Sequence, residues 1–237
     1  MAFRKAQRQK AKLRLAITGA AGSGKTYSSL LIAQGLGGKI AMIDTENGSG
    51  DLYANLCDYD VCSLSAPYDP RKYKNAILEA AQSGYDTIII DSLSHEWSGS
   101  GGCLDLQSRI AETSKSQNSY IAWGKVTPMH NALIETILTS PCHIIATMRS
   151  KTEYLQSQND RGRSEIRKVG LAPVQREGMD YEFSVVFDLS ENHMASVSKD
   201  RTGLFDGQII QLSPDTGKVL RQWLDAGVSV SNGGEAQ

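Results

Sequence analysis

The sequence predicts an α/β domain in which helices cover both faces of a doubly wound, mainly parallel sheet. Short apolar runs that fit buried strands alternate along the chain of 237 residues with segments whose apolar residues recur at helical spacing. A glycine-rich turn joins the first apolar run to the first of these helices. Three further short strands, separated by turn residues, follow late in the chain and predict a β-meander at the edge of the sheet.

The glycine-rich turn is the stretch Gly19-Ala-Ala-Gly-Ser-Gly-Lys-Thr26, called the phosphate loop below. Its spacing fits G-x-x-x-x-G-K-[ST], and its context of strand, turn and helix is the one that motif requires. Backbone N–H groups at a helix N-terminus point at phosphate oxygens, where the helix dipole favours anions. The loop therefore predicts nucleoside triphosphate binding, with Lys25 on the β- and γ-phosphates and the Thr26 hydroxyl on Mg²⁺. The candidate ligands are Gly19, Gly22, Ser23, Gly24, Lys25 and Thr26.

The remaining elements are expected from apolar periodicity and from glycine or proline at their ends. Strands are predicted at about 13–18, 39–44, 61–64, 87–91, 143–148, 183–189, 195–198 and 208–212, and helices at about 25–36, 70–81, 104–116, 122–139 and 218–225, with a helical turn near 52–56. From Arg149 to Asp180 the chain is polar with few periodic apolar positions. We expect a long loop there, and such loops are often functional.

Three regions are predicted. Residues 1–12 form a basic flexible arm, residues 13–226 form one P-loop ATPase domain, and residues 227–237 form a flexible tail. Residues 1–14 carry six cations and no acid, which leaves the rest at −7, with 19 cations against 26 acids. A basic arm of this kind favours contact with a polyanion or an acidic neighbour. A disordered, solubilising arm is the alternative.

Composition excludes several other classes of protein. No run of 18 apolar residues occurs, so no membrane span is expected, and no apolar signal core follows the basic N-terminus. The four cysteines are expected to be free thiols in a reducing cytoplasm. Cys57-x-x-x-x-Cys62 lacks the second ligand pair of a zinc site. The four histidines show no ligand spacing, and we assign them no chemistry.

Two carboxylates are candidates for binding Mg²⁺ and for activating the water that attacks the triphosphate. Asp91 ends the most apolar strand, where an acid beside the phosphate loop can hold a Mg²⁺-bound water. Glu46 follows the strand that ends at Asp44, where it can orient the attacking water as general base. A loop carboxylate facing solvent is the alternative for Glu46.

A resemblance to RecA recombinases adds to this interpretation. The stretch Met42-Ile-Asp-Thr-Glu-Asn47 followed by Asp51-Leu-Tyr-Ala54 resembles the part of that family where a catalytic Glu is followed seven residues later by a tyrosine that stacks on adenine. The resemblance implies those roles for Glu46 and Tyr53. Ser198-Lys199-Asp200-Arg201 is similar to the K-x-R element with which RecA-like ATPases reach the neighbouring subunit's γ-phosphate. It implies that Lys199 and Arg201 act across an interface, in a ring or filament.

The resemblance covers residues 13–225 and leaves no room for an added DNA-binding domain, as in the core-only RecA-like ATPases of bacteriophages, some of which are Sak-type single-strand annealing proteins. It implies ATP and Mg²⁺ as ligands, a bacterial host cytoplasm, single-stranded DNA as partner and sometimes a single-strand-binding protein. The sequence departs from RecA at Ala146-Thr-Met-Arg149, where the family has a glutamine that senses the γ-phosphate. Thr147 and Arg149 are the candidates to replace it.

In RecA-like proteins two loops bind single-stranded DNA. The first corresponds to residues 97–102, and the second to the polar segment after residue 148. Cations in this segment can pair with DNA phosphates, and an aromatic ring such as that of Tyr154 can stack on a base. The alternative for this segment is an ordinary solvated loop. Trp97 and Trp123 are candidates either for stacking on DNA bases or for burial in the hydrophobic core. The candidate DNA-binding residues are Arg149, Lys151, Arg161, Arg163, Arg167 and Lys168.

Three functions fit these motifs. The first is a DNA-dependent ATPase in phage recombination or annealing, with a site shared between subunits. The second is an ATP-gated binding module with little turnover, a reading the missing glutamine favours. The third is another P-loop enzyme, either helicase-like or a small-molecule kinase, although no arginine-rich kinase lid is present.

Overall fold

The computed structural model describes residue 3 and residues 5–113, 118–158 and 164–228, except for the side chains of residues 152–158 and 164–171. The strands are β1 (Arg14–Gly19), β2 (Ile40–Asp44), β3 (Asp60–Ser63), β4 (Thr87–Asp91), β5 (His143–Gln158), β6 (Ser164–Pro173), β7 (Val185–Leu189), β8 (Met194–Asp200) and β9 (Ile209–Gln211). The helices are α1 (Lys25–Leu36), α2 (Pro70–Gln82), α3 (Ser94–Ser98), α4 (Cys103–Thr113), α5 (Ser119–Thr139) and α6 (Pro214–Asp225), with 3₁₀ turns η1 (Ser49–Tyr53) and η2 (Met179–Glu182).

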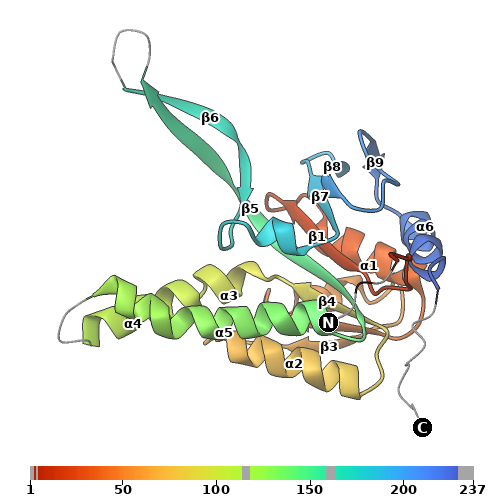
Figure 1. The fold of residues 1–237 in the computed structure, drawn as a ribbon, viewed down its shortest axis with the longest axis horizontal. Coiled ribbons are helices and arrows are strands. Elements are labelled where there is room, and N and C mark those ends of the chain that lie inside the picture. Colours follow the sequence, from red (N-terminus) through yellow and green to blue (C-terminus); the bar gives the residue numbers. More distant parts are fainter. Residues whose placement is uncertain (1–2, 4, 114–117, 159–163, 229–237) are drawn as a thin grey trace.

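The sheet has the order β3-β2-β4-β5-β1-β7-β8-β9, with β6 paired to β5 outside this path. Its first six strands are parallel, whereas β8 and β9 return antiparallel as the predicted meander. The predicted fold class, doubly wound and mainly parallel, is confirmed. The carboxyl ends of β2, β4 and β1 lie at one edge of the sheet, where the phosphate loop follows β1, and β5, between β4 and β1, continues past that edge (Figure 1).

Apolar residues fill both faces of the sheet because successive side chains of a buried strand point to opposite sides. Ile88 and Ile90 belong to the cluster under α2 and α5, whereas Ile89 belongs to the cluster under α1 and α6. The helices α1 and α6 approach closely at two glycines. A Cβ added at Gly35 would lie 1.9 Å from the Pro214 carbonyl oxygen, so only glycine fits this contact.

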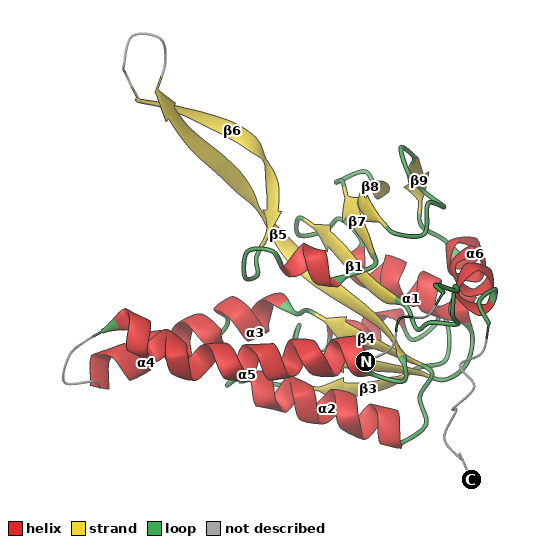
Figure 2. Ribbon diagram, in the orientation of Figure 1, coloured by secondary structure: helices red, strands yellow, loops and turns green. Residues whose placement is uncertain are grey.

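The long polar segment is a β-hairpin, so the expectation of a loop there was wrong. Strand β5 continues ten residues past the predicted end at Met148, and β6 returns along it, from Gln158↔Ser164 to Ser150↔Pro173. The hairpin projects from the body of the protein as a two-stranded ribbon (Figure 2). Backbone pairing forms this ribbon without an alternating apolar face, and that face is the signal that sequence patterns detect.

Most other elements lie within a few residues of their predicted positions. Helix α1 and strand β4 have the predicted bounds, and the turn expected near 52–56 is η1, slightly earlier. Helix α6 begins at Pro214, four residues before the prediction, where Ser213 and Thr216 form a capping box. The short helix α3 was missed because five residues are too few to show a periodicity.

Arg14, one of the six cations counted over residues 1–14, is buried at the start of β1 and stabilises the fold. Its guanidinium donates to the carbonyl oxygens of Leu13 and Cys142, both at 2.8 Å, and to Leu138 at 3.0 Å and Ser140 at 2.5 Å, the last two at the end of α5. A cation there satisfies free carbonyls and the helix dipole. Burial lowers its pKa to about 10. One of the six N-terminal cations is therefore unavailable for an external polyanion.

The end of the N-terminal arm lies against α6. Lys10 N donates to the Val228 carbonyl at 3.1 Å, and the Arg8 guanidinium lies 4.0 Å from the centre of the Trp223 ring. All four cysteines are free thiols, as expected. Within the described residues, no helix has the length and apolar character that crossing a bilayer requires.

A buried histidine makes the stability depend on pH. His143 is 2% exposed, and its Nδ1 accepts the backbone N–H of Leu13 at 3.0 Å, so folding favours the neutral ring. Burial lowers its pKa to about 4, whereas an unfolded histidine titrates near 6.5. The stabilising contribution is therefore complete above pH 6.5 and is lost as the pH falls toward 4.

Between pH 7 and pH 5 the free energy of unfolding should fall by about 2 kcal/mol from this group. Urea unfolding at the two pH values measures it. His143→Asn keeps an acceptor near Nδ1 but does not titrate, so that variant should show a smaller pH dependence. An equal dependence in both proteins would refute the assignment to His143.

Candidate functional site

The phosphate loop connects β1 to α1 at the carboxyl edge of the sheet. Gly22 and Gly24 adopt φ angles of 79° and 90°, which side chains disfavour, so these glycines let the chain turn into the helix. Ser28 N donates to the Gly24 carbonyl at 2.9 Å as the helix begins. The loop therefore places the first N–H groups of a 12-residue helix around one point, as anion binding requires.

Lys25 lies with its ammonium inside this loop. Its Nζ donates to the carbonyl oxygens of Gly19 at 3.0 Å and Ala20 at 2.7 Å. Burial lowers the pKa of Lys25, while the carboxylates of Asp91 and Glu46 act in the opposite direction. The site therefore holds a partly desolvated cation between two acids, an arrangement that favours a phosphate with a bound metal.

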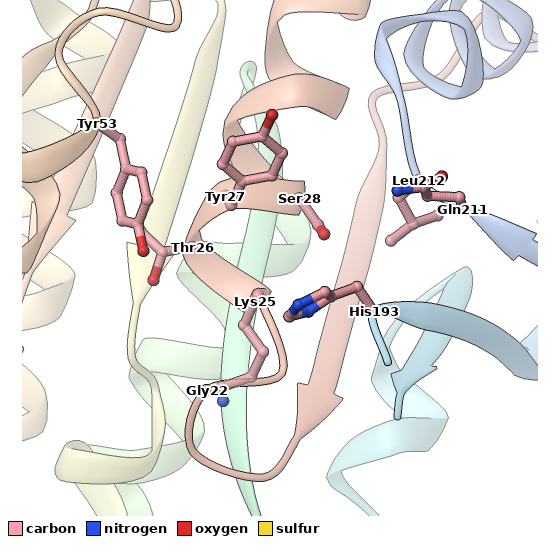
Figure 3. A pocket seen from close by; sticks show the side chains of 10 residues that line it. Gly22, Lys25, Thr26, Tyr27, Ser28, Tyr53, His193, Gln211 and Leu212 are labelled. Atoms are coloured by element: carbon pink, nitrogen blue, oxygen red, sulfur yellow. The ribbon is translucent and has the colours of Figure 1, made fainter. Parts of the chain in front are cut away.

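A pocket of about 430 Å³ opens beside the loop (Figure 3). The loop and the start of α1 line it, and Tyr53 of η1 lies beside Tyr27, with the two ring centroids 6.1 Å apart in an edge-on arrangement. Tyr53 therefore lines the pocket beside the phosphate loop, and its contact with an adenine stays a prediction. The lining residues are Gly22, Gly24, Lys25, Thr26, Tyr27, Ser28, Tyr53, His193, Gln211 and Leu212.

Asp91 lies beside Thr26, as a shared metal site requires. The Thr26 hydroxyl donates to Asp91 Oδ2 at 2.6 Å, and the Thr147 hydroxyl donates to Asp91 Oδ1. Burial raises the pKa of Asp91, and the two hydroxyl donors oppose that rise. The acid is 2% exposed, and both of its oxygens are held in place by neighbours from α1 and β5.

Glu46 is set at the same edge by the end of β2. Asp44 pairs with Asp91 in register, and the Thr45 N–H donates to the Asp91 carbonyl at 2.7 Å. Asp44 Oδ1 accepts the Glu46 N–H at 2.6 Å, which turns the chain after the strand. Glu46 thus stands on a turn next to Asp91 that a hydrogen bond from its own backbone N–H holds in place, rather than on a free loop.

Arg149 holds the Glu46 carboxylate with both arms of its guanidinium. Its Nε donates to Glu46 Oε1 at 2.9 Å, and Nη2 contacts Oε2. Burial raises the pKa of Glu46, but the hydrogen bonds and charge of Arg149 outweigh it and hold that pKa below its ordinary value. Since Arg149 pairs in register with Gly19, the cation also lies beside the phosphate loop.

A family model described as an AAA domain matches residues 11–230. The chain belongs to this family. The match spans every residue described in this site and supplies the general activity class, a nucleotide-binding domain of the ATPase type. A comparison with curated proteins found no match.

Lys199 and Arg201 lie away from the phosphate loop of their own AAA domain. Lys199 is opposite Val186 in the sheet, toward the amino end of β1, whereas the phosphate loop follows the carboxyl end. Its Nζ donates to the carbonyls of Asp180 at 3.1 Å and Tyr181 at 2.5 Å, and Arg201 reaches Tyr181 at 3.3 Å. Within one chain these cations do not contact the triphosphate site.

The six candidate DNA-binding residues fall into three groups. Arg149 is paired with Glu46 in the site, and Lys151 is exposed at the base of the hairpin. Arg167 and Lys168 lie on β6, in the part whose side chains are not described. Arg161 and Arg163 lie outside the described residues.

The segment predicted as a first DNA loop is helical only in its first two residues, Trp97 and Ser98, and is otherwise a turn. It begins within α3 and ends in the turn before α4. The ring of Trp97 stacks on that of Trp123 with centroids 5.6 Å apart, and both are half-buried. The two indoles thus pack on each other.

His193, which shows no ligand spacing in the sequence, lines the pocket beside the phosphate loop. Its Nδ1 lies 3.0 Å from the Ser23 carbonyl, at the tip of the β7–β8 turn (Figure 3). The pairing of β7 with β1, which puts Leu189 beside Gly19, carries this turn to the phosphate loop. Gln211 and Leu212 were missed for the same reason, since only the strand order brings them there.

The pair of Arg149 and Glu46 predicts an unequal effect on ATP and ADP. In Arg149→Ala, ATP affinity should fall roughly 10- to 100-fold, the typical loss of a charge-assisted contact to a phosphate, while ADP affinity stays within about twofold. Fluorescent-nucleotide titration measures both. Arg71→Ala is the matched control, because Arg71 also pairs with an acid, Asp69, at 2.5 Å but lies in the first turn of α2 and not at the phosphate loop. Equal losses for ATP and ADP would contradict a contact with the γ-phosphate.

Proposed function

We propose that this AAA-domain protein hydrolyses ATP with Mg²⁺ and couples that cycle to single-stranded DNA, in phage recombination or strand annealing. The observation that carries the hydrolytic part is the convergence of Thr26, Asp91 and Glu46 at one edge of the sheet. A hydroxyl and a carboxylate 2.6 Å apart form the pair that a phosphate-bound Mg²⁺ requires, and a second carboxylate stands beside them.

The residues present fit Mg²⁺, because the candidate ligands are hard oxygen atoms and Asp91 is already held in place by two hydroxyl groups. When bound, the ion neutralises charge on the β- and γ-phosphates. Thr26 and Asp91 would hold it, the former directly and the latter through water. Lys25 would leave the carbonyls of Gly19 and Ala20 for the phosphate oxygens.

Glu46 would accept the proton of the attacking water. Its lowered pKa keeps it ionised at neutral pH, which a base requires. The bidentate contact with Arg149 occupies both carboxylate oxygens, so the base is restrained until Arg149 has another partner. The γ-phosphate is such a partner, and transfer of Arg149 to it would free Glu46. Arg149 would then replace the glutamine of RecA.

Single-stranded DNA is the proposed partner because the strand that carries Arg149 continues into the projecting hairpin. The segment from Arg149 to Lys168 carries six cations against three acids. A basic ribbon attached to the γ-phosphate side of the site could report nucleotide state to a polyanion. A single-strand-binding protein is a further proposed partner.

The second candidate is an ATP-gated module that binds DNA or protein with little turnover. The same pair of Arg149 and Glu46 favours it, since a base that stays restrained would leave ATP bound but intact. ATP turnover with and without single-stranded DNA separates the two. A stable ATP complex without DNA stimulation or strand binding would support the module and refute the DNA-dependent enzyme.

Subunit sharing rests on Lys199 and Arg201, which cannot serve their own phosphate loop. Arg201→Ala should leave ATP affinity largely unchanged but reduce turnover by roughly 10³-fold, the scale of an arginine supplied in trans, and weaken nucleotide-dependent assembly. Arg109→Ala, also exposed and paired with an acid, is the control. Normal hydrolysis by Arg201→Ala would show that the trans role is wrong. Electron microscopy with an ATP analogue and single-stranded DNA should show rings or filaments; monomers under these conditions would refute sharing.

A further inference from the structure

Three side chains that can ligate a metal meet in the interior, apart from the nucleotide pocket. Glu96 comes from α3, Cys103 begins α4, and His130 lies in α5. Their ligand atoms all lie within 4.8 Å of one another, and the residues are 0%, 0% and 3% exposed. Burying a carboxylate and an imidazole away from water is costly, so their placement in one spot calls for a role.

The contacts centre on one carboxylate oxygen. Glu96 Oε1 lies 3.0 Å from Cys103 Sγ and 2.9 Å from His130 Nδ1. Zinc bonds of about 2.0–2.3 Å place tetrahedral ligand atoms about 3.3–3.6 Å apart. An ion would therefore need Glu96 Oε1 to move about half an ångström away from each of these two partners, which small side-chain rotations supply.

The surroundings hold the carboxylate in place and include a cavity. Gln175 Nε2 donates to the other oxygen, Glu96 Oε2, at 3.2 Å and to the Leu93 carbonyl at 3.1 Å, which fixes the carboxylate as outer partners of metal ligands do. The Trp97 ring lies edge-on to His130 at 5.6 Å. His130 also lines a pocket of about 180 Å³, so one of the three ligand residues borders a cavity.

We propose that Glu96, Cys103 and His130 form a zinc site that ties α3, α4 and α5 together. A thiolate, an imidazole and a carboxylate are all ligands that Zn²⁺ accepts. On binding, a Zn–S bond forms, the S–H bond of Cys103 breaks, and its proton leaves to the buffer, while His130 binds through Nδ1 as the neutral tautomer that carries its proton on Nε2. The charges of one thiolate and one carboxylate then cancel those of the ion, so the buried site is neutral. Helix α3 starts three residues after Asp91. The zinc ion would therefore restrict the motion of the end of β4, which carries Asp91, the proposed Mg²⁺ ligand of the nucleotide site.

Cobalt titration of the full chain tests this site without any nucleotide. The protein is stripped with a chelator in a Cys57→Ser, Cys62→Ser background, which removes the two cysteines that are not buried. We expect one Co²⁺ per chain, with the near-ultraviolet absorption of a sulfur–cobalt bond, and displacement by Zn²⁺. Cobalt held by Thr26 and Asp91 has no sulfur ligand and gives no such band.

Substitutions then locate the sulfur. Cys103→Ala should abolish the band while the circular-dichroism spectrum stays unchanged, and Cys142→Ala, which removes the other buried thiol, should keep it. Gln175→Ala should weaken cobalt affinity roughly 10- to 100-fold. A band that survives Cys103→Ala, or no band in any variant, would overturn the proposal and leave a hydrogen-bonded cluster only.

X-ray absorption of the zinc-loaded parent chain covers the case in which Cys103→Ala does not fold. One sulfur at about 2.3 Å with nitrogen and oxygen neighbours is expected. A shell without sulfur would refute the site. Neither readout depends on ATP or DNA, so their failure leaves the proposed function standing.

Discussion

Lys25→Ala should abolish tight binding of ATP. The side chain is the cation of the phosphate loop, and its loss leaves phosphate oxygens next to Asp91 and Glu46 with less compensation. Truncating one partner of a desolvated charge pair costs about 2–5 kcal/mol, so affinity should fall by roughly 30-fold to several-thousand-fold. Isothermal titration with Mg-ATP measures it.

The control for this experiment is Lys218→Ala. Lys218 is an exposed lysine on α6 whose ammonium lies 2.8 Å from Asp215, and it is not among the residues that line the pocket. The affinity of the Lys218→Ala variant for ATP should match that of the parent protein. Unchanged ATP affinity in Lys25→Ala, with the fold intact by circular dichroism, would mean that the loop does not bind the triphosphate.

Glu46→Gln should remove hydrolysis and keep ATP. A glutamine has nearly the same shape but cannot take a proton, and general-base catalysis contributes about 10²- to 10⁴-fold to a rate. Turnover should fall by that factor. Since ATP binding should persist, the variant is expected to accumulate as an ATP-bound protein.

Single-turnover phosphate release and ATP binding are measured side by side on Glu46→Gln. Glu79→Gln, an exposed carboxylate on α2, serves as control and should behave as the parent. If Glu46→Gln hydrolyses at the parental rate, another group activates the water. A parallel loss of binding and turnover would instead indicate that Glu46 serves the fold of the site.

The central elements of this domain could be predicted because each carries its own local signal. A glycine-rich turn between an apolar strand and a helix specifies the phosphate loop, and a run such as Thr87-Ile-Ile-Ile-Asp91 specifies a buried parallel strand. Asp91 and Thr26 then meet because parallel strands present their carboxyl ends at one edge. These inferences need only neighbouring residues and one topological rule.

What escaped prediction depends on distant segments. His193 reaches the phosphate loop only because β7 pairs with β1, and Arg149 reaches Glu46 only because β5 lies between β4 and β1. The three residues of the proposed zinc site come from three helices with no common spacing. The hairpin lacks the apolar alternation that reveals a strand, although its backbone pairing is regular.

The most direct test of the proposed function is ATP turnover by the full chain, with Mg²⁺, in the presence and absence of single-stranded DNA. We expect phosphate release that requires Mg²⁺, rises when the DNA is added, and disappears in Glu46→Gln. No phosphate release under any of these conditions would contradict hydrolysis at this site. Release that is indifferent to DNA would contradict its coupling to single strands.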